Sequence, residues 1–152
     1  SLAWEEHKRR ERARRAESGA DPSVLADVPR ALPALTRALK LQRRAARVGF
    51  DWPAAAPILA KLREELDEVE QALAAGDAAA VADEIGDLLF TVVNLARHLE
   101  VDPEAALRGC NARFERRFRT IERTLAAQGR DPASCPLDEL ERLWTEAKRG
   151  EP

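Results

Sequence analysis

Five carboxylates in two short motifs are the residues of this sequence that are best placed to do chemistry. Glu64, Glu65 and Glu68 form the first motif, and Glu84 and Asp87 form the second. Residues three or four apart share one face of an α-helix, so each motif presents its carboxylates on one side of a helix. Neither motif contains His or Cys. An all-oxygen site of this kind suits a hard divalent cation, Mg²⁺ or Mn²⁺, rather than zinc.

The second motif belongs to a segment that is apolar almost all the way round. Between residues 85 and 96 the only side chains that are neither apolar nor Gly are Asp87, Thr91 and Asn94. At about 100° per residue these three fall on one line. A helix that is apolar on its other sides is normally buried, and an unpaired buried carboxylate is strongly unfavourable. We therefore expect Glu84 and Asp87 to be buried and to need a cation.

Hydrophobic periodicity places both motifs on helices of one all-α domain. The expected helices run over residues 33–48, from 58 to before Gly76, over 81–99, from 103 to before Gly129, and over 137–148. Gly at the end of an apolar period is a typical helix stop, and no segment alternates as a strand would. We expect a bundle of four to five helices, in which the turn at Gly76 and Asp77 brings the two carboxylate motifs together.

Residues 1 to about 30 differ in composition from the rest of the chain. Residues 4–17 are crowded with Glu, Lys and Arg, and residues 18–23 contain Gly and Pro, which break helices. We interpret 1–30 as a charged arm or interdomain linker and 31–150 as the catalytic helical domain. The chain opens with Ser1 and contains no Met, so we expect it to be a piece of a longer polypeptide.

Composition narrows the class of protein. The 152 residues are 45% hydrophobic and 34% charged, with a formal net charge of −2, which is typical of a globular domain and gives no reason to expect nucleic acid or a membrane as a partner. The two cysteines have no metal-binding spacing, and no segment has the length of a secretory signal or a membrane span. We expect a cytoplasmic protein with reduced thiols.

The apolar segment 81–99 needs cover on two sides. One side carries Phe90, Val93 and Ala96, and the other carries Ile85, Leu88, Val92 and Leu95. In so small a chain the second cover is most simply provided by another copy. We predict a homodimer, or a higher even oligomer, built on this helix, and we expect a charge at Phe90 or Val93 to disrupt it.

The two carboxylate motifs resemble the EExxE…ExxD signature of the MazG family of nucleoside triphosphate pyrophosphohydrolases, within the all-α NTP pyrophosphatase superfamily. The resemblance covers roughly residues 28 to 149 and includes residues 32–35, 48–52, 86–90, 93–98 and 113–118. Many MazG proteins hold two such modules in tandem. This chain resembles the C-terminal, catalytic module, and its charged arm is similar to the interdomain linker.

The resemblance implies roles for individual residues. It implies that the Mg²⁺ ligands are Glu65, Glu68, Glu84 and Asp87. Glu64 matches the additional carboxylate of the motif, whose role as ligand, base or surface residue stays open. The resemblance further implies that Lys61, Arg113 and Arg117 approach the phosphates of a nucleotide and that Trp144 contacts the nucleotide. For Trp144 the competing interpretation is core packing. We interpret Asn94 as a hydrogen-bond donor, either to the phosphates or to the side chains that bind the Mg²⁺. The competing interpretation is that Asn94 only ends the line of polar side chains on the segment 81–99.

These roles predict an enzyme that hydrolyses ribo- and deoxynucleoside triphosphates. No Ser or Cys lies beside a His in a motif position, so the expected nucleophile is a metal-activated water and not a protein side chain. Cleavage to a nucleoside monophosphate and pyrophosphate is implied by the resemblance. Stacking on Trp144 would accept any base, so we predict a broad base range. Two alternatives stay open: a narrow-specificity relative acting on dUTP or phosphoribosyl-ATP, and a non-catalytic helical regulatory module. A di-iron site is disfavoured because it needs Glu-x-x-His pairs.

Overall fold

The computed structural model describes all residues from Ser1 to Pro152, and they fold into α-helices without any strand. The helices are α1 (Leu2–Glu17), α2 (Ala34–Arg47), α3 (Ala55–Ala75), α4 (Ala78–His98), α5 (Pro103–Ala126) and α6 (Leu137–Arg149), with a single 3₁₀ turn at Pro132–Ser134. The all-α fold and the five helices expected after residue 31 are confirmed. The chain divides into two compact units, Ser1–Glu104 and Ala105–Pro152.

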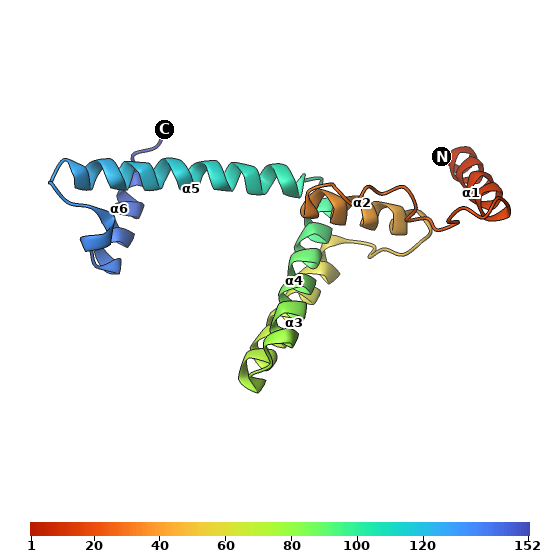
Figure 1. Ribbon diagram of the computed structural model, residues 1–152, viewed down its shortest axis with the longest axis horizontal. Helices are drawn as coiled ribbons and strands as arrows, with labels where there is room; N and C mark the ends of the chain where they lie inside the picture. The colour runs from red at the N-terminus through yellow and green to blue at the C-terminus, as the bar shows by residue number, and fades with distance from the viewer. The chain divides into compact units, whose positions relative to one another are not determined.

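The centre of the first unit is an antiparallel hairpin of α3 and α4 (Figure 1). Gly76 ends α3 in the left-handed region, with φ of 68°, which favours a residue without Cβ. Asp77 then caps α4, because its side chain accepts a hydrogen bond from the Ala80 amide at 3.1 Å. This two-residue turn brings the first carboxylate motif on α3 beside the second on α4.

Helix α2 packs against α4, and the core of the first unit lies among these helices. Ile58 on α3 and Val93 on α4 are fully buried, and Leu39 on α2 is nearly so. Gln42 on α2 donates from Nε2 to the carbonyl of Phe90 at 2.9 Å, which fixes the register between α2 and α4.

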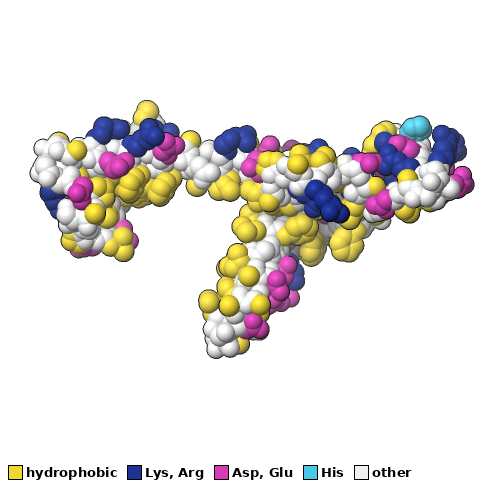
Figure 2. Space-filling model, viewed as in Figure 1, with side chains coloured by type: hydrophobic (Ala, Val, Ile, Leu, Met, Phe, Trp, Pro, Cys, Tyr) yellow, Lys and Arg dark blue, Asp and Glu magenta, His cyan; other side chains and the backbone are white.

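The single chain leaves much of the hairpin's apolar surface uncovered. Exposed apolar side chains on the two helices are Leu59, Leu66, Leu73, Ile85, Leu89, Phe90 and Val92. Figure 2 shows hydrophobic atoms at the surface of this hairpin. Val93, where we expected a charge to disrupt an oligomer, is 1% exposed and packs inside its own chain. No helix is long and apolar enough to cross a membrane.

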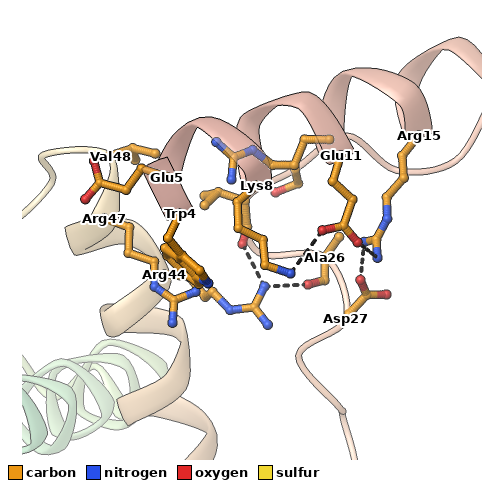
Figure 3. Close-up of a pocket in the computed structure, with 13 residues that line it drawn as sticks. Trp4, Glu5, Lys8, Glu11, Arg15, Ala26, Asp27, Arg44, Arg47 and Val48 are labelled. Carbon is orange, nitrogen blue, oxygen red and sulfur yellow. Dashed lines mark hydrogen bonds and ion pairs between the residues drawn. The ribbon is translucent and has the colours of Figure 1, made fainter. Parts of the chain in front are cut away.

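The charged arm is helical, and it lies against α2 through polar contacts (Figure 3). None of the α1 side chains is buried. The Arg47 guanidinium lies 4.6 Å from the centre of the Trp4 ring, and Arg15 pairs with Asp27. Arg44 donates to the carbonyls of Val24 and Ala26, at 3.2 and 3.0 Å, and so holds the segment after α1 on α2.

The second unit is built from α5 and α6. Ile121 and Leu125 on α5 and Leu143 on α6 form its buried core. Trp144 packs against this core and contacts Phe114, with ring centres 5.4 Å apart. Cys135, in the segment between the helices, packs at the edge of the core and carries a free thiol, as Cys110 does.

Candidate metal centre

Three carboxylates of the α3–α4 hairpin form a compact cluster. One carboxylate oxygen from each of Glu65, Glu84 and Asp87 lies within 4.8 Å of the others. Glu65 comes from α3, and the other two come from neighbouring turns of α4. Residues three apart on α4 face α3 together, so the hairpin itself assembles the cluster.

Burial is uneven across this cluster. Glu65 is 4% exposed, Glu84 is half-buried, and Asp87 is exposed. Our expectation that Asp87 is buried was therefore wrong for the single chain. Helix α3 covers only one side of α4, so Asp87 stands at the open edge of the cluster rather than beneath it. A ligand can reach the cluster from that edge.

Two oxygens of the cluster are buried without a hydrogen-bond partner: Oε2 of Glu65 and Oε2 of Glu84. A buried carboxylate oxygen with no donor is unfavourable, and such atoms in native structures call for an explanation, for example an ion. The donor set consists only of carboxylate oxygens. A hard divalent cation, Mg²⁺ or Mn²⁺, fits both the donor set and the two unpaired oxygens.

Glu68 completes the acidic group from the next turn of α3. Its carboxyl group is a side-chain hydrogen-bond partner of the Glu84 carboxyl group. This hydrogen bond, together with burial and the nearby negative charges of Glu68, Glu65 and Asp87, raises the pKa of Glu84 to about 7. In the metal-free protein Glu84 is therefore partly protonated near neutral pH, and a bound cation would compete with that proton.

Lys61 is the cation that the chain itself supplies to this cluster. Its Nζ lies 3.1 Å from Oε1 of Glu65 and 3.6 Å from Oε1 of Glu64, one turn along α3. The hydrogen bond to Glu65 raises the pKa of the Lys61 ammonium despite partial burial. Glu64 is mostly exposed, with 60% of its side chain accessible. One lysine does not balance the acidic group formed by Glu65, Glu68, Glu84 and Asp87.

Asn94 lies two turns beyond Asp87 on the same line of α4 and is buried. Its Oδ1 accepts a hydrogen bond from Arg97 at 2.6 Å. Arg97 also donates to Asp51, at 2.5 and 3.1 Å, and His98 lies 2.9 Å from the same carboxylate. These contacts, with the Arg97 hydrogen bond as the main cause, hold the pKa of Asp51 well below its usual range. The Asn94 amide is thus held by Arg97 of the same helix, and Arg97 is in turn bound to Asp51 in the loop that follows α2.

The remaining sequence-predicted residues lie in the second unit. Arg117 makes two hydrogen bonds with Glu151, at 2.9 and 3.0 Å, and its guanidinium lies 5.5 Å from the centre of the Trp144 ring. Arg113 is exposed on α5, near Gly109. Trp144 packs as the competing interpretation expects. The structure therefore brings together Lys61, Glu64, Glu65, Glu68, Glu84 and Asp87, and separately Arg117 and Trp144.

Sequence reasoning missed Gln42, Asp51 and Arg97. Gln42 is buried on α2, its Nε2 binds the Phe90 carbonyl, and its Oε1 has no partner. A signal for it was present: Gln42 follows Leu35 and Leu39 at helical spacing, so it is a polar residue on an apolar face.

The chain is similar to a family of pyrophosphohydrolases and to individual proteins named as such. The family model described as phosphoribosyl-ATP pyrophosphohydrolase matches residues 32–114, which include both motifs. The nucleoside triphosphate pyrophosphohydrolase of Escherichia coli (strain K12) is 48% identical over 150 residues, covering 97% of this chain and 56% of that protein. The nucleoside triphosphate pyrophosphohydrolase/pyrophosphatase MazG of Thermotoga maritima is 35% identical over 148 residues, covering 97% and 55%. The chain spans about half the length of these curated relatives.

Proposed function

The chain belongs to the phosphoribosyl-ATP pyrophosphohydrolase family, within the MazG-like superfamily, and we propose that it is the catalytic module of a metal-dependent nucleoside triphosphate pyrophosphohydrolase. Its products are a nucleoside monophosphate and pyrophosphate. The observation that carries this proposal is the acidic cluster with two buried, unpaired carboxylate oxygens. The names of the relatives with 48% and 35% identity support the reaction.

Glu65, Glu68, Glu84 and Asp87 would hold the cation, Mg²⁺ or Mn²⁺. A divalent cation bound there supplies Lewis-acid chemistry, which neutralises phosphate oxygens and acidifies a water molecule. Lys61 stays charged beside Glu65 and adds positive charge for the phosphates. Glu64 is an exposed carboxylate next to Lys61 and can accept a proton from the attacking water.

Asn94, Arg113, Arg117 and Trp144 are the further substrate contacts in this proposal. Arg117 must exchange Glu151 for a phosphate oxygen, since Glu151 occupies its guanidinium in the structure. The exposed apolar face of α4 supports the proposed homodimer or higher even oligomer. The free thiols of Cys110 and Cys135 fit the cytoplasmic location proposed from the sequence.

Product analysis with Mg²⁺ tests the proposal directly. The eight common ribo- and deoxynucleoside triphosphates and phosphoribosyl-ATP are incubated with the protein, and pyrophosphate and orthophosphate are measured separately. We expect pyrophosphate release from all eight triphosphates, and none when the metal is chelated. Orthophosphate as the product, or activity confined to dUTP or to phosphoribosyl-ATP, would overturn the proposal. No metal-dependent release with any substrate would favour a non-catalytic helical module.

A further inference from the structure

A cavity of about 290 Å³ lies between α1, the segment after α1 and α2, all within the first unit. We call it the arm cavity. Figure 3 shows the side chains of Arg44 and Arg47 extending from α2 toward α1. Five basic side chains line the arm cavity: Lys8, Arg12, Arg15, Arg44 and Arg47. So many positive charges around one cavity stand out in a chain whose formal net charge is −2.

The carboxylates of the lining compensate only part of this positive charge. Glu11 pairs with Lys8 at 3.0 Å and with Arg15 at 3.3 Å, and Asp27 pairs with Arg15 as well. Glu5, the third carboxylate of the lining, is exposed and forms no ion pair. Lys8 and Arg15 therefore have their counterions within the chain.

The other three basic side chains have no carboxylate partner. Arg44 donates through Nη1 to two backbone carbonyls, at 3.2 and 3.0 Å, and no hydrogen bond uses its Nε or Nη2. The Arg47 guanidinium lies over the Trp4 ring, 4.6 Å from its centre, and forms no ion pair. Arg12 is half-buried on α1 and forms neither a hydrogen bond nor an ion pair. Against the one free carboxylate of the lining, two positive charges remain in excess.

The free groups of the arm cavity are hydrogen-bond donors. A guanidinium presents its N–H groups as a planar fork, which matches the oxygens of a phosphate group. Ser23 also lines the cavity; its Oγ accepts a hydrogen bond from the Leu25 amide at 3.0 Å, so its hydroxyl hydrogen is left to donate. The volume lies at the lower end of the range for small-molecule sites. Charge, donors and size together suit a small phosphate anion.

We propose that the arm cavity binds a small anion of the phosphate class and that this anion links α1 to α2. Arg12 would hold it from α1, and Arg44 and Arg47 would hold it from α2. None of the α1 side chains is buried, so the arm is held on α2 by polar and ring contacts, and a bridging anion adds to them. The inference does not rest on the proposed function, because the acidic cluster contributes no residue to this cavity.

Calorimetry with inorganic pyrophosphate tests the site. The whole chain is titrated at constant ionic strength with EDTA present, so that no divalent cation can carry the anion to the acidic cluster. Arg12→Gln should weaken binding by about tenfold or more, because it removes a charged hydrogen-bond donor. Arg12 has no contact within the chain that holds the fold. Arg14→Gln is the matched control, since Arg14 is exposed on the same helix outside the cavity lining, and its affinity should equal that of the wild type.

Hydrogen exchange tests whether the anion links the two helices. A helix held only at its surface opens locally, and a ligand bound between it and its neighbour slows that opening. Pyrophosphate should therefore slow exchange of the α1 amides in the wild type and in Arg14→Gln, and not in Arg12→Gln. The amides of α6, in the second unit, are the internal reference and should be unaffected. Unchanged exchange of α1 with pyrophosphate bound would overturn the linking role.

The remaining outcomes decide the site itself. No binding of pyrophosphate to the wild type, or equal loss in Arg12→Gln and Arg14→Gln, would overturn the proposal, the second because it shows only a general effect of charge. Loss of binding in Lys61→Gln, with Arg12→Gln unchanged, would assign the anion to the α3–α4 hairpin instead. AMP carries a phosphate group on a nucleoside and is titrated in parallel. AMP binding that depends on Arg12 would support the site and name a nucleotide as a second source of the phosphate group.

Discussion

Two carboxylates of the second unit, Glu139 and Glu151, are neutralised by arginines of the same unit. Glu139 accepts hydrogen bonds from Arg130 at 2.6 and 2.8 Å, and Glu151 accepts two from Arg117. The arginine hydrogen bonds lower the pKa of both carboxyl groups. A carboxylate held in this way by a guanidinium already has its counterion.

The carboxylates of the acidic cluster on the α3–α4 hairpin have one basic partner between them, Lys61 beside Glu65. Glu84 lies against Glu68, Glu65 and Asp87, and its pKa is raised to about 7. Glu65 and Glu84 each keep a buried oxygen without a partner. The contrast with Glu139 shows that acidic residues on a helix are not informative in themselves. What marks the hairpin as a candidate site is a negative charge that its single lysine, Lys61, does not balance.

The strongest test of this contrast removes one charge from the hairpin. Glu84→Gln or Asp87→Asn should lower metal-dependent hydrolysis by more than about 100-fold, because each removes a ligand for the cation, while the helical circular dichroism signal is kept. Unchanged turnover in either variant would remove the metal centre from the hairpin. Metal-free Glu84→Gln should also unfold at a higher temperature than the wild type at pH 8, where Glu84 is ionised, and not at pH 5, where it is protonated.

The hairpin also leaves apolar surface exposed, which the proposed dimer would cover. Leu89 on α4 is 52% exposed, and burial of one Leu contributes about 1.5–3 kcal/mol. In a two-fold symmetric dimer each substitution counts twice, so Leu89→Asp should weaken the dimer by about 100-fold or more in sedimentation equilibrium. Leu137→Asp in the second unit is the control and should leave the dimer intact. A wild-type monomer that is stable and active would end the argument for oligomerisation through α4.

Val93 is not suitable for testing oligomerisation by introducing a charge, although we expected it to be. It is fully buried within its own chain, so a charge there would unfold the first unit whatever the oligomeric state. Periodicity tells which residues share a side of a helix. It does not tell whether that side meets another helix of the same chain or a second copy, because this depends on how helices distant in sequence pack.

Much of the fold and the acidic cluster could be predicted from sequence, since both follow from local rules. Apolar spacing and the stops at Gly49, Gly76 and Gly129 located the helix ends to within a few residues. The i, i+3 pairs and the short turn placed the carboxylates together. The contact of Gln42 with Phe90 and that of Asp51 with Arg97 join residues 48 and 46 positions apart, and no local pattern specifies such pairs. Gln42, Asp51 and Arg97 were missed for this reason.

The pH dependence of metal affinity is a further test of the difference between Glu84 and the arginine-paired carboxylates, and its expected effect is smaller than that of the substitutions. The raised pKa of Glu84, about 7, means that a cation must displace a proton below that pH. Affinity for Mn²⁺ should therefore fall by up to about tenfold per pH unit below 7 and level off above it. Calorimetric titrations at pH 6, 7 and 8 measure this directly. Affinity independent of pH over this range would mean that the cation does not compete with the proton of Glu84.

The smallest effect is expected in the second unit, where Glu139 gives the stability change opposite to that of Glu84. Its pKa is lowered in the folded protein by Arg130, so its contribution to stability is present above the unfolded pKa of about 4.3 and is lost as the pH falls through the folded value. Glu139→Gln should therefore lower the urea midpoint slightly at pH 7 and have little effect at pH 3, without changing turnover. A partly exposed ion pair contributes little to the free energy of unfolding, so the expected change in the urea midpoint is small. Glu139→Gln and Glu84→Gln are therefore measured side by side in the same buffers. A higher midpoint for Glu139→Gln at pH 7 would contradict the contrast, because Glu139 would then be as poorly compensated as Glu84.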